Sequence, residues 1–498
     1  MCTSPRAASI HVLDDDSLLH VFHLYRPHFL GEDHDQDAHL WGGNGGWERG
    51  RWWYKLAHVC QRWRKVMLWS ASYLGVFLVC TKGTRVADML AHSPPLPLVI
   101  DYRFGDTLVT AEDKEGIILA LKQHDRVHRV RLQMPVTSLQ EFIAVMDDEY
   151  PILEYLIIDY WVNDISHGIS LILPEALQAP HLRHLALAGF ALPIGCRLLT
   201  SAVGLVAFCL VVTHPSTYFH PNTLLQWLSL MPHLKTLVIH HLSPDSNYDV
   251  EWQLTHTPII TPVTLPNLYR FAFQGTSSYL EALVHRITTP RLERLEVKFF
   301  FQLTFSLPRL LQFINTTERL KLESAQLNFT DECVSVASPL SQESEMYALV
   351  IVVQYWCLDR QVSSMAQISD SLSQVFSAVK HLTLHHNVNN LLSEEYDEVD
   401  RRTEWRKLLS SFRNVRTLRI DSRMDKELSR SLKSNGGELP LELLPELQEL
   451  TYSGSCDAAD APSSFISACQ NADRRITLLR RSPSPGSISD EAGSDRDI

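Results

Sequence analysis

The chain has 498 residues, of which 45% are hydrophobic and 20% are charged, and these proportions exclude a wholly disordered chain, a collagen and a coiled-coil rod. Its 57 Asp and Glu residues outnumber its 45 Lys and Arg residues, so the net charge is −12 and we expect no general nucleic-acid-binding surface. A chain of this length predicts about three domains, unless part of it is an extended repeat array.

The cysteines and the apolar runs indicate the compartment. Nine cysteines are scattered along the chain without a Cys-x-x-Cys pair, which argues against a disulfide framework or a structural zinc site and favours a reducing compartment. The N-terminal stretch lacks the apolar core of a secretory signal. The most membrane-like run, Leu198 to Val212, has 15 residues, whereas a spanning helix needs about 20. We therefore expect buried structure there, no membrane partner, and a cytoplasmic or nuclear protein.

Residues 9–92 are rich in Trp and Leu and predict a helical module. The segment VLDDDSLLHVFHLYRPHF, which starts at Val12, has three aspartates followed by an apolar stripe, and an acidic first turn stabilises a helix. A polar, Gly-rich stretch near residues 31–50 predicts a loop insertion. A second helix is predicted after it, because apolar residues recur at steps of four and three, namely at Trp52, Leu56, Val59, Trp63 and Val66.

A leucine pattern recurs over residues 93–479. Each copy has an apolar residue, two other residues, an apolar residue, one other residue and a last apolar residue. Clear copies begin at Leu182, Leu234, Leu268, Leu292, Val379, Val415 and Leu447, and weaker copies begin at Val127, Leu153, Leu205, Thr317 and Tyr347. The mean period is about 29 residues. The last two apolar positions lie two residues apart, as on one face of a strand, so each copy predicts a short strand.

Helical spacing appears between many copies, for example at 223–231, 278–287, 307–314 and 404–412. Each unit supplies one strand and one helix, and stacking the units creates one continuous core. The predicted fold is α/β, with a helical module at 9–92, an irregular repeat solenoid at 93–479 and a disordered tail at 480–498 that is rich in Ser, Pro, Gly and Asp. The alternative is an ordinary α/β domain with leucine-rich strands.

The repeats resemble a leucine-rich-repeat solenoid, although the Asn that usually follows the last strand leucine by three residues matches only at Asn387. The N-terminal module resembles an F-box, as in fungal F-box proteins that carry leucine-rich repeats. An F-box is a helical module that docks onto the Skp-family adaptor of a cullin–RING ubiquitin ligase. The resemblance implies adaptor contacts at Leu13, Leu18, Leu19, Val21, Phe22, Leu56, Val59, Cys60 and Trp63. Two departures are the long insertion and Asp14, which occupies the place of the usual Pro.

The strand positions between the buried leucines are candidate target-binding positions. In a leucine-rich-repeat solenoid the strands line the concave side, and these positions point outward from it. The candidates are Arg294, Glu296, Lys298, Arg319, Lys321, Glu323, His381 and His385. Their mixed charges suit either the polar surface of a partner protein or a salt-bridge ladder within the chain.

The sequence contains no Gly-x-Ser-x-Gly elbow, no phosphate-binding Gly-x-x-x-x-Gly-Lys and no His-Glu-x-x-His, so we predict no catalytic residue, metal or cofactor. The resemblances together imply a non-enzymatic substrate-recognition subunit of an SCF-type ubiquitin ligase, bound to the Skp-family adaptor and cullin complex and to an unknown target protein. One alternative is a leucine-rich-repeat interaction scaffold without a ubiquitin role, whose N-terminal helices are only a cap. Another is a hydrolase whose residues meet only in three dimensions.

Overall fold

A computed structural model covers the chain, and it describes residues 13–26, 51–104, 109–160, 170–193, 195–242, 262–300, 302, 304–339, 346–387, 398–431, 443–453 and 476–481. The chain divides into two compact units. The first comprises Met1–Asp249 and Ile259–Leu268, and the second comprises Val250–Pro258 and Tyr269–Ile498.

The first unit begins with the helical module. Its helices are α1 (Asp15–Tyr25), α3 (Trp52–Ala57), α4 (Gln61–Trp69) and α5 (Ala71–Leu74). Helix α1 begins after Asp14, whose side chain accepts a hydrogen bond from the backbone of Ser17. Helix α5 ends at Gly75, which has a φ of 61° and therefore adopts the left-handed conformation that favours glycine. Helix α4 packs against both α1 and α3, so the four helices form one small core.

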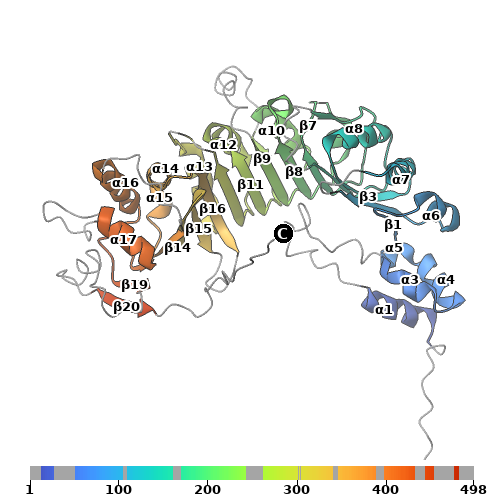
Figure 1. Cartoon of the computed structure of the whole chain (residues 1–498), viewed down its shortest axis with the longest axis horizontal. Helices are drawn as coiled ribbons and strands as arrows, with labels where there is room; N and C mark the ends of the chain where they lie inside the picture. Colours follow the sequence, from blue (N-terminus) through green and yellow to red (C-terminus); the bar gives the residue numbers. More distant parts are fainter. Residues whose placement is uncertain are drawn as a thin grey trace, which may run out of the picture. The chain divides into compact units, whose positions relative to one another are not determined.

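A parallel sheet follows in the same unit. Its strands, in spatial order, are β1 (Leu78–Cys80), β2 (Leu98–Arg103), β3 (Val127–Gln133), β4 (Tyr155–Asp159), β6 (His184–Ala188), β8 (Ala207–Val212) and β9 (Thr236–His241). Its helices are α6 (Val86–His92), α7 (Ala111–Leu121), α8 (Val136–Val145), α9 (Arg197–Ser201) and α10 (Pro221–Ser229). Helices α7, α8 and α10 lie on one side of the strands (Figure 1). The buried leucines of the repeat pattern, such as Leu185 and Leu187, fill the space between strands and helices.

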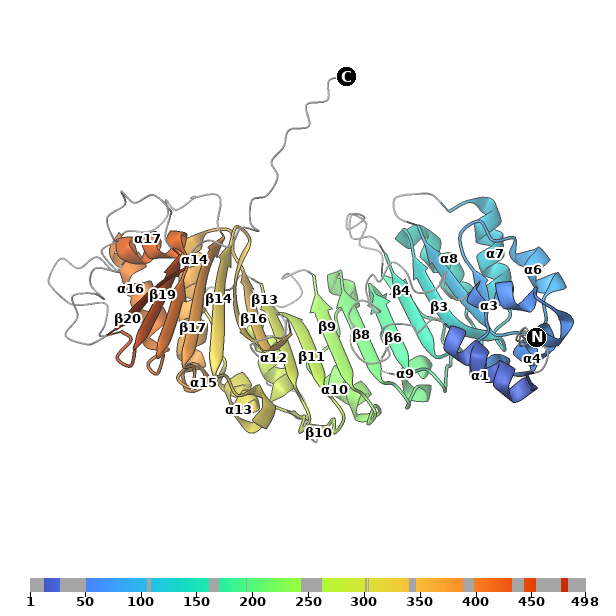
Figure 2. The ribbon, with the colours of Figure 1, turned by 90° about the horizontal axis from the view of Figure 1, so that it is seen from below.

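The second unit continues the strand-and-helix alternation with one reversal. Its strands, in spatial order, are β11 (Arg270–Gly275), β13 (Arg294–Phe299), β16 (Tyr347–Gln354), β15 (Cys333–Pro339), β14 (Ser324–Thr330), β17 (His381–Asn387), β18 (Thr417–Ile420), β19 (Glu449–Ser453) and β20 (Thr477–Arg481). Strand β15 is antiparallel to both of its neighbours, whereas the other described pairs are parallel. Figure 2 shows these strands side by side. Its helices are α12 (Ser277–Val284), α13 (Pro308–Thr316), η6 (Glu318–Leu320), α14 (Leu358–Ser371), α15 (Ser373–Phe376), α16 (Glu398–Ser410) and α17 (Ser422–Ser431).

The structure confirms a mixed α/β fold with long parallel sheet segments, and it changes several details. The weak copy at Thr317 is wrong, because residues 318–320 form a 3-10 helix and strand β14 begins only at Ser324. The sheet starts at Leu78, before the predicted boundary at residue 93. Arg480 and Arg481, which we assigned to a disordered tail, belong to β20.

Some predictions concern residues outside the described ranges. The insertion near residues 31–50 and the tail from residue 482 onward are among them. The apolar run from Leu198 to Val212 forms part of α9 and then strand β8, as its short length predicted. Among the described residues, no helix combines the length and the apolar character needed to cross a bilayer.

Candidate functional site

Helix α1 has one side in the core of the helical module. Leu18 and Phe22 have no exposed surface, and the ring of Phe22 meets the ring of Trp63 edge-on, with centroids 5.0 Å apart and an interplanar angle of 65°. Trp63 is also buried. These three side chains were predicted to contact a partner directly, and their burial corrects that assignment, because they are used in the packing of α1 on α4.

A second side of α1 carries apolar side chains toward solvent. Of the predicted contact residues, Leu13, Val21 and Val59 are exposed, with 41% of Val21 and 57% of Val59 accessible. Leu19, Leu56 and Cys60 are partly buried. The sequence reasoning missed four further exposed apolar residues of the module, namely Leu24, Tyr25, Trp69 and Tyr73, of which Trp69 is 80% exposed. Val21, Leu24 and Tyr25 are three and four residues apart, so they form one stripe along α1.

Polar contacts hold the start of α1 against α4. Arg62 donates to the carbonyl oxygen of Leu13 over 2.6 Å and pairs with the carboxylate of Asp15 over 2.7 Å. Asp14 accepts the backbone N–H of Ser17 over 2.7 Å, and this hydrogen bond lowers the pKa of the Asp14 carboxyl. The Asp that departs from the F-box pattern is therefore the N-cap of the helix, which fixes where α1 begins.

The module is also tied to the first strand of the sheet. The indole Nε1 of Trp53 donates to the carbonyl oxygen of Phe77 over 3.1 Å, and the Arg51 guanidinium donates to the carbonyl oxygen of Val79 over 3.3 Å. Strand β1 is the first strand of the unit's sheet order. The helices thus cover the beginning of the sheet as well as carrying an exposed apolar stripe.

The helix-distal face of the sheet consists of the strand side chains that alternate with the buried pattern leucines. In the second unit, the predicted residues Arg294, Glu296 and Lys298 all belong to this face on β13. Glu296 pairs across the strands with Arg270 over 3.4 Å, and burial lowers the pKa of the Arg270 guanidinium while the Glu296 charge opposes that change. This part of the face matches the salt-bridge alternative that the sequence left open.

The middle group of predicted residues is not on a strand. Arg319 lies in the 3-10 helix η6 and forms an ion pair with Glu293, whereas Lys321 and Glu323 precede β14. Lys321 and Glu323 line a pocket at the edge of the sheet instead of its face. The apolar pair Leu320 and Leu322 matched the strand template because both are buried, and burial alone does not distinguish a 3-10 turn from a strand.

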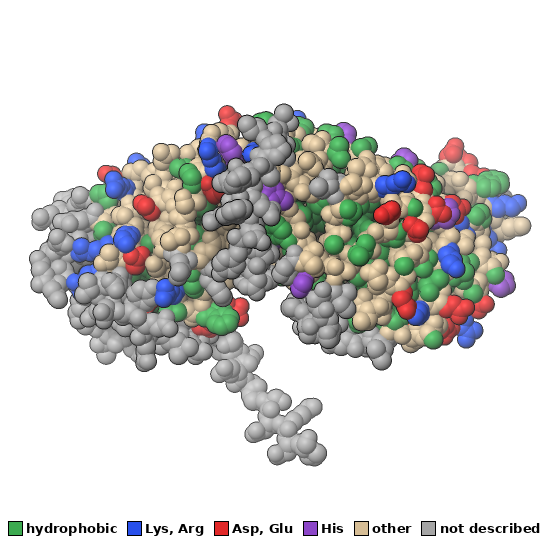
Figure 3. All heavy atoms as spheres, turned by 90° about the horizontal axis from the view of Figure 1, so that it is seen from above, with side chains coloured by type: hydrophobic (Ala, Val, Ile, Leu, Met, Phe, Trp, Pro, Cys, Tyr) green, Lys and Arg blue, Asp and Glu red, His purple; other side chains and the backbone are tan. Residues whose placement is uncertain are grey.

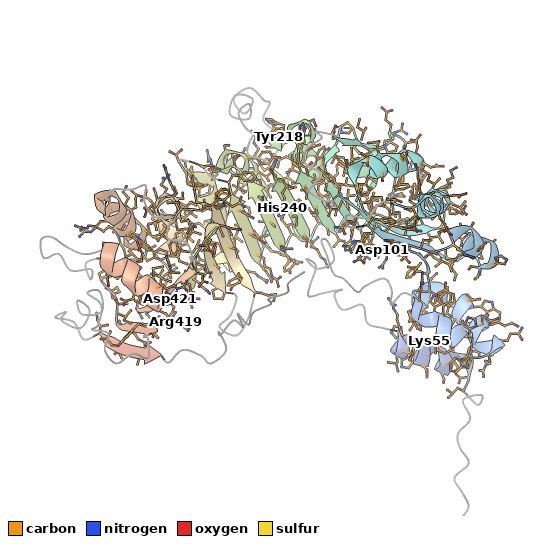
Figure 4. The ribbon with its side chains drawn as sticks, in the orientation of Figure 1. Lys55, Asp101, Tyr218, His240, Arg419 and Asp421 are labelled. Atoms are coloured by element: carbon orange, nitrogen blue, oxygen red, sulfur yellow. The ribbon has the colours of Figure 1, made fainter. Side chains whose placement is uncertain are left out.

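The two predicted histidines lie on β17, within a polar part of the helix-distal face. The Nδ1 atom of His381 is 2.7 Å from Oγ1 of Thr417, and the Nδ1 atom of His385 is 3.8 Å from Oδ2 of Asp421. Figure 4 shows Asp421 close to Arg419, beside α17. The strand register adds the neighbours Gln326, Asn328, Thr383 and Arg419. Thr383 and Arg419 alternate with pattern residues of the copies at Val379 and Val415, so the sequence predicted exposed strand positions for them. Gln326 and Asn328 were missed, because β14 follows the residues that the weak copy at Thr317 assigned to a strand.

Asp421 orders the end of β18 and the start of α17. Its two oxygens accept the backbone N–H groups of His386 and Met424, each over 2.7 Å. Burial raises the pKa of Asp421, but the nearby His385 imidazole and the hydrogen bonds from the two amides outweigh it, and the net pKa is lowered. His385 therefore faces an ionised carboxylate that the backbone holds in place.

The helix-distal face of the first unit carries a charged cluster on β2, β3 and β4. The Arg103 guanidinium contacts Asp101 through two hydrogen bonds of 2.9 and 3.1 Å. Arg131, on the next strand, is only 5% exposed and its Nε atom has no hydrogen-bond partner. Burial raises the pKa of Asp159 to about 6, although the positive charge of Arg131 opposes this. Figure 4 shows Asp101 at this position in the sheet.

A stack of flat side chains lies next to this cluster. The guanidinium of Arg129 lies 4.1 Å from the ring centroid of Tyr155, and the rings of Tyr155 and His184 are stacked with centroids 4.1 Å apart. These three residues are register partners on β3, β4 and β6. Because the three side chains pack on one another across neighbouring strands, we assign the stack to the stability of the sheet.

The described surface has mixed charge and no metal cluster. Acidic and basic side chains are interspersed among the coloured side chains in the view of Figure 3. Within the described ranges, no group of three or more His, Cys, Asp and Glu side chains could hold a metal ion. The features that stand out chemically are the apolar stripe of the helical module and the polar face of β14, β17 and β18.

No family profile and no curated protein sequence matches the chain. Among solved structures, the chain is similar to the leucine-rich repeat-containing protein LegL7 from Legionella pneumophila. That match has 10% sequence identity and a TM-score of 0.26, and it covers 80% of this chain and 99% of that chain.

Proposed function

We propose that this chain is a substrate-recognition subunit of an SCF-type cullin–RING ubiquitin ligase. The helical module would bind the Skp-family adaptor, and the helix-distal face of the repeats would bind a target protein. The chain itself would perform no chemistry and use no cofactor. Its contribution would be to raise the effective concentration of target lysines near the ubiquitin donor. A cytoplasmic or nuclear location goes with this proposal.

The observation that carries the proposal is the exposed apolar stripe of the module. The core is already filled by Leu18, Phe22 and Trp63, so the exposed side chains of Val21 and Leu24 are not needed to close it. Apolar side chains that gather on a surface commonly mark a protein-binding site. The F-box resemblance of the same segment supports a Skp-family adaptor as the partner.

The target side of the proposal depends on the polar face of β14, β17 and β18. Amide, hydroxyl and imidazole groups alternate there with Arg419 and Asp421, and they are held at strand spacing by the register. Such a surface offers many directional donors and acceptors, which favours a partner with exposed polar groups.

The test is co-purification of the full chain with a Skp-family adaptor. We expect the unmodified chain to capture the adaptor, and the double variant Val21→Asp, Leu24→Asp to lose it, because two charges would be placed within the stripe. Substitutions of Leu18 or Phe22 are avoided because they would disrupt the core. The matched control is Ile172→Asp, which makes the same kind of change at an exposed apolar residue of the repeats.

The proposal is contradicted if the double variant still captures the adaptor, or if the unmodified chain does not. Circular dichroism of each variant verifies that the fold is retained. A loss of capture by Ile172→Asp as well would indicate a general effect of added charge, and would remove the stripe as the binding site.

A second candidate function is a repeat scaffold whose N-terminal helices are only a cap. The observation that favours it is the pair of contacts from Arg51 and Trp53 to the backbone around β1. Terminal repeats of a solenoid require such a cover. Under this alternative the chain would capture target proteins but no adaptor, which the same experiment distinguishes.

A further inference from the structure

A pocket lies at the edge of the second unit where strands β14, β17 and β18 begin. It has a volume of about 610 Å³ and is formed by the ends of α13 and α15 together with the residues that lead into the three strands. Figure 2 shows α13 and α15 beside the start of these strands. This volume lies within the range of pockets that bury a ligand of several hundred daltons or a short peptide.

The inner part of the pocket is apolar. Ile314 at the end of α13 and Val375 of α15 contribute buried side chains, and Leu320 and Leu322 contribute two more. All four are packed in the core of the unit, so their positions are fixed before any ligand arrives. Such a surface binds aliphatic groups.

The outer part of the pocket carries three cations. Lys321, Lys380 and Arg416 line it together with two carboxylates, those of Glu323 and Glu446. Glu323 is already engaged by Lys380, whose Nζ atom lies 3.3 Å from its Oε1 atom. Among the described residues, neither Lys321 nor Arg416 has an ion-pair partner within 4 Å. Two exposed cations therefore remain available to a ligand.

The strand register sets the spacing of these groups. The backbone N–H of Lys380 bonds to the carbonyl oxygen of Glu323, and the N–H of Arg416 bonds to the carbonyl oxygen of Lys380. Glu323, Lys380 and Arg416 thus immediately precede the three neighbouring strands β14, β17 and β18, at about 4.8 Å per step. The backbones of Glu323 and Arg416 are consequently about 10 Å apart, a span that a peptide of a few residues bridges.

We propose that this pocket binds a short acidic peptide segment in which two carboxylates, three residues apart, flank aliphatic side chains. The aliphatic groups would lie on Ile314 and Val375. One carboxylate would pair with Lys321, and the other would take the two-pronged contact that an Arg such as Arg416 offers. The site lies at the edge of the sheet and does not depend on an adaptor, so it goes beyond the function proposed above.

The experiment measures binding of a fluorescein-labelled, capped tetrapeptide, Asp-Leu-Leu-Glu, to the full chain by fluorescence anisotropy. We expect saturable binding, and at least about tenfold weaker binding of the uncharged peptide Asn-Leu-Leu-Gln, because hydrogen bonds to charged groups contribute about 1.5–3 kcal/mol. The small acid isovalerate should compete at least about tenfold less well than the unlabelled acidic peptide, because it fills only one part of the pocket.

Variants assign the binding to the pocket. The pair Lys321→Glu, Arg416→Glu should weaken binding at least about tenfold. Arg413→Glu is the control, since it reverses the charge of one exposed arginine that does not line the pocket, and it should leave the affinity within about twofold. Ala378→Trp fills the pocket without changing its charge and should also abolish binding.

Three outcomes would overturn the proposal. Absence of saturable binding, equal binding of the charged and uncharged peptides, or unchanged binding by both the charge-reversal pair and Ala378→Trp would each do so. Isovalerate binding as tightly as the peptide would assign the pocket to small aliphatic acids instead. Circular dichroism shows whether each variant is folded. The charge-reversal pair changes the charge of the pocket and the tryptophan variant changes its volume, so either variant still tests the proposal if the other does not fold.

Discussion

Replacing Asp159 with Asn should stabilise the first unit, and the effect should depend on pH. In the folded protein the pKa of Asp159 is about 6, compared with an ordinary value of 3.8, because burial disfavours the ionised carboxylate. The folded state therefore retains a proton between about pH 4 and 6 that the unfolded chain has released. The contribution of Asp159 to stability is largest below pH 4, falls as the pH rises through about 6, and is constant above that.

The magnitude follows from the difference between the two pKa values. About 2 pH units, at about 1.4 kcal/mol each, give about 3 kcal/mol at pH 8. Asn has the shape of the protonated acid and does not ionise, so Asp159→Asn should raise the free energy of unfolding by up to about 3 kcal/mol at pH 8 and by almost nothing near pH 4. Its amide oxygen is still able to accept the hydrogen bond from Gln133.

The assay is urea-induced unfolding of variant and unmodified chain, followed by circular dichroism at pH 8 and at pH 4.5. Only the difference between the two proteins is interpreted, because other groups titrate in both. Asp147→Asn, the same substitution at an exposed site, is the control. A difference of the same size at both pH values, or a destabilised variant at pH 8, would refute the explanation by burial.

Four further substitutions test the packing and one helix cap. Gly189→Ala should lower the free energy of unfolding by about 2 kcal/mol or more in urea unfolding, because Gly189 has a φ of 72° and the added Cβ meets the ring of Tyr160. Gly83→Ala, with a φ of 76° and open space around it, should cost only about 1–2 kcal/mol, and equal costs at the two sites would contradict the role of Tyr160. Phe22→Ala should cost about 3–5 kcal/mol and expose Trp63, detected as a red shift of tryptophan fluorescence, and an unchanged spectrum would show that Phe22 does not cover that ring. Asp421→Ala should cost about 1 kcal/mol and speed amide hydrogen exchange in the first turn of α17 more than elsewhere, and uniform exchange would contradict its role as the helix cap.

The leucine pattern predicted the parallel strands well, because it reports the side chains that a repeat must bury. The copies at Leu182, Leu234 and Leu292 have their strand leucines at 0–1% exposure. The pattern could not reveal β15, since its buried residues, Val334 and Val336 to Ser338, do not have the spacing of a repeat. Pairing between distant segments is a tertiary property, and no local pattern encodes it.

The sequence also could not identify the exposed apolar stripe of the helical module. Both Leu18 and Val21 are apolar residues of α1, and the sequence does not indicate which of them faces inward. The answer depends on where Trp63 of α4 packs. The acidic start of α1 was predictable, since Asp14 acts locally as a helix cap. The edge pocket was not predicted, because its cations come from three separate repeats.

The reversed strand β15 also bears on the order in which the second unit can assemble. In a regular repeat array each strand finds its neighbour as soon as the next repeat is made. Here β13 ends at Phe299, but its neighbour β16 begins only at Tyr347, after β14 and β15. During synthesis, this edge of β13 therefore stays unpaired until the distant strand β16 has been made. A nascent chain released before residue 354 would expose the unpaired edge to other chains.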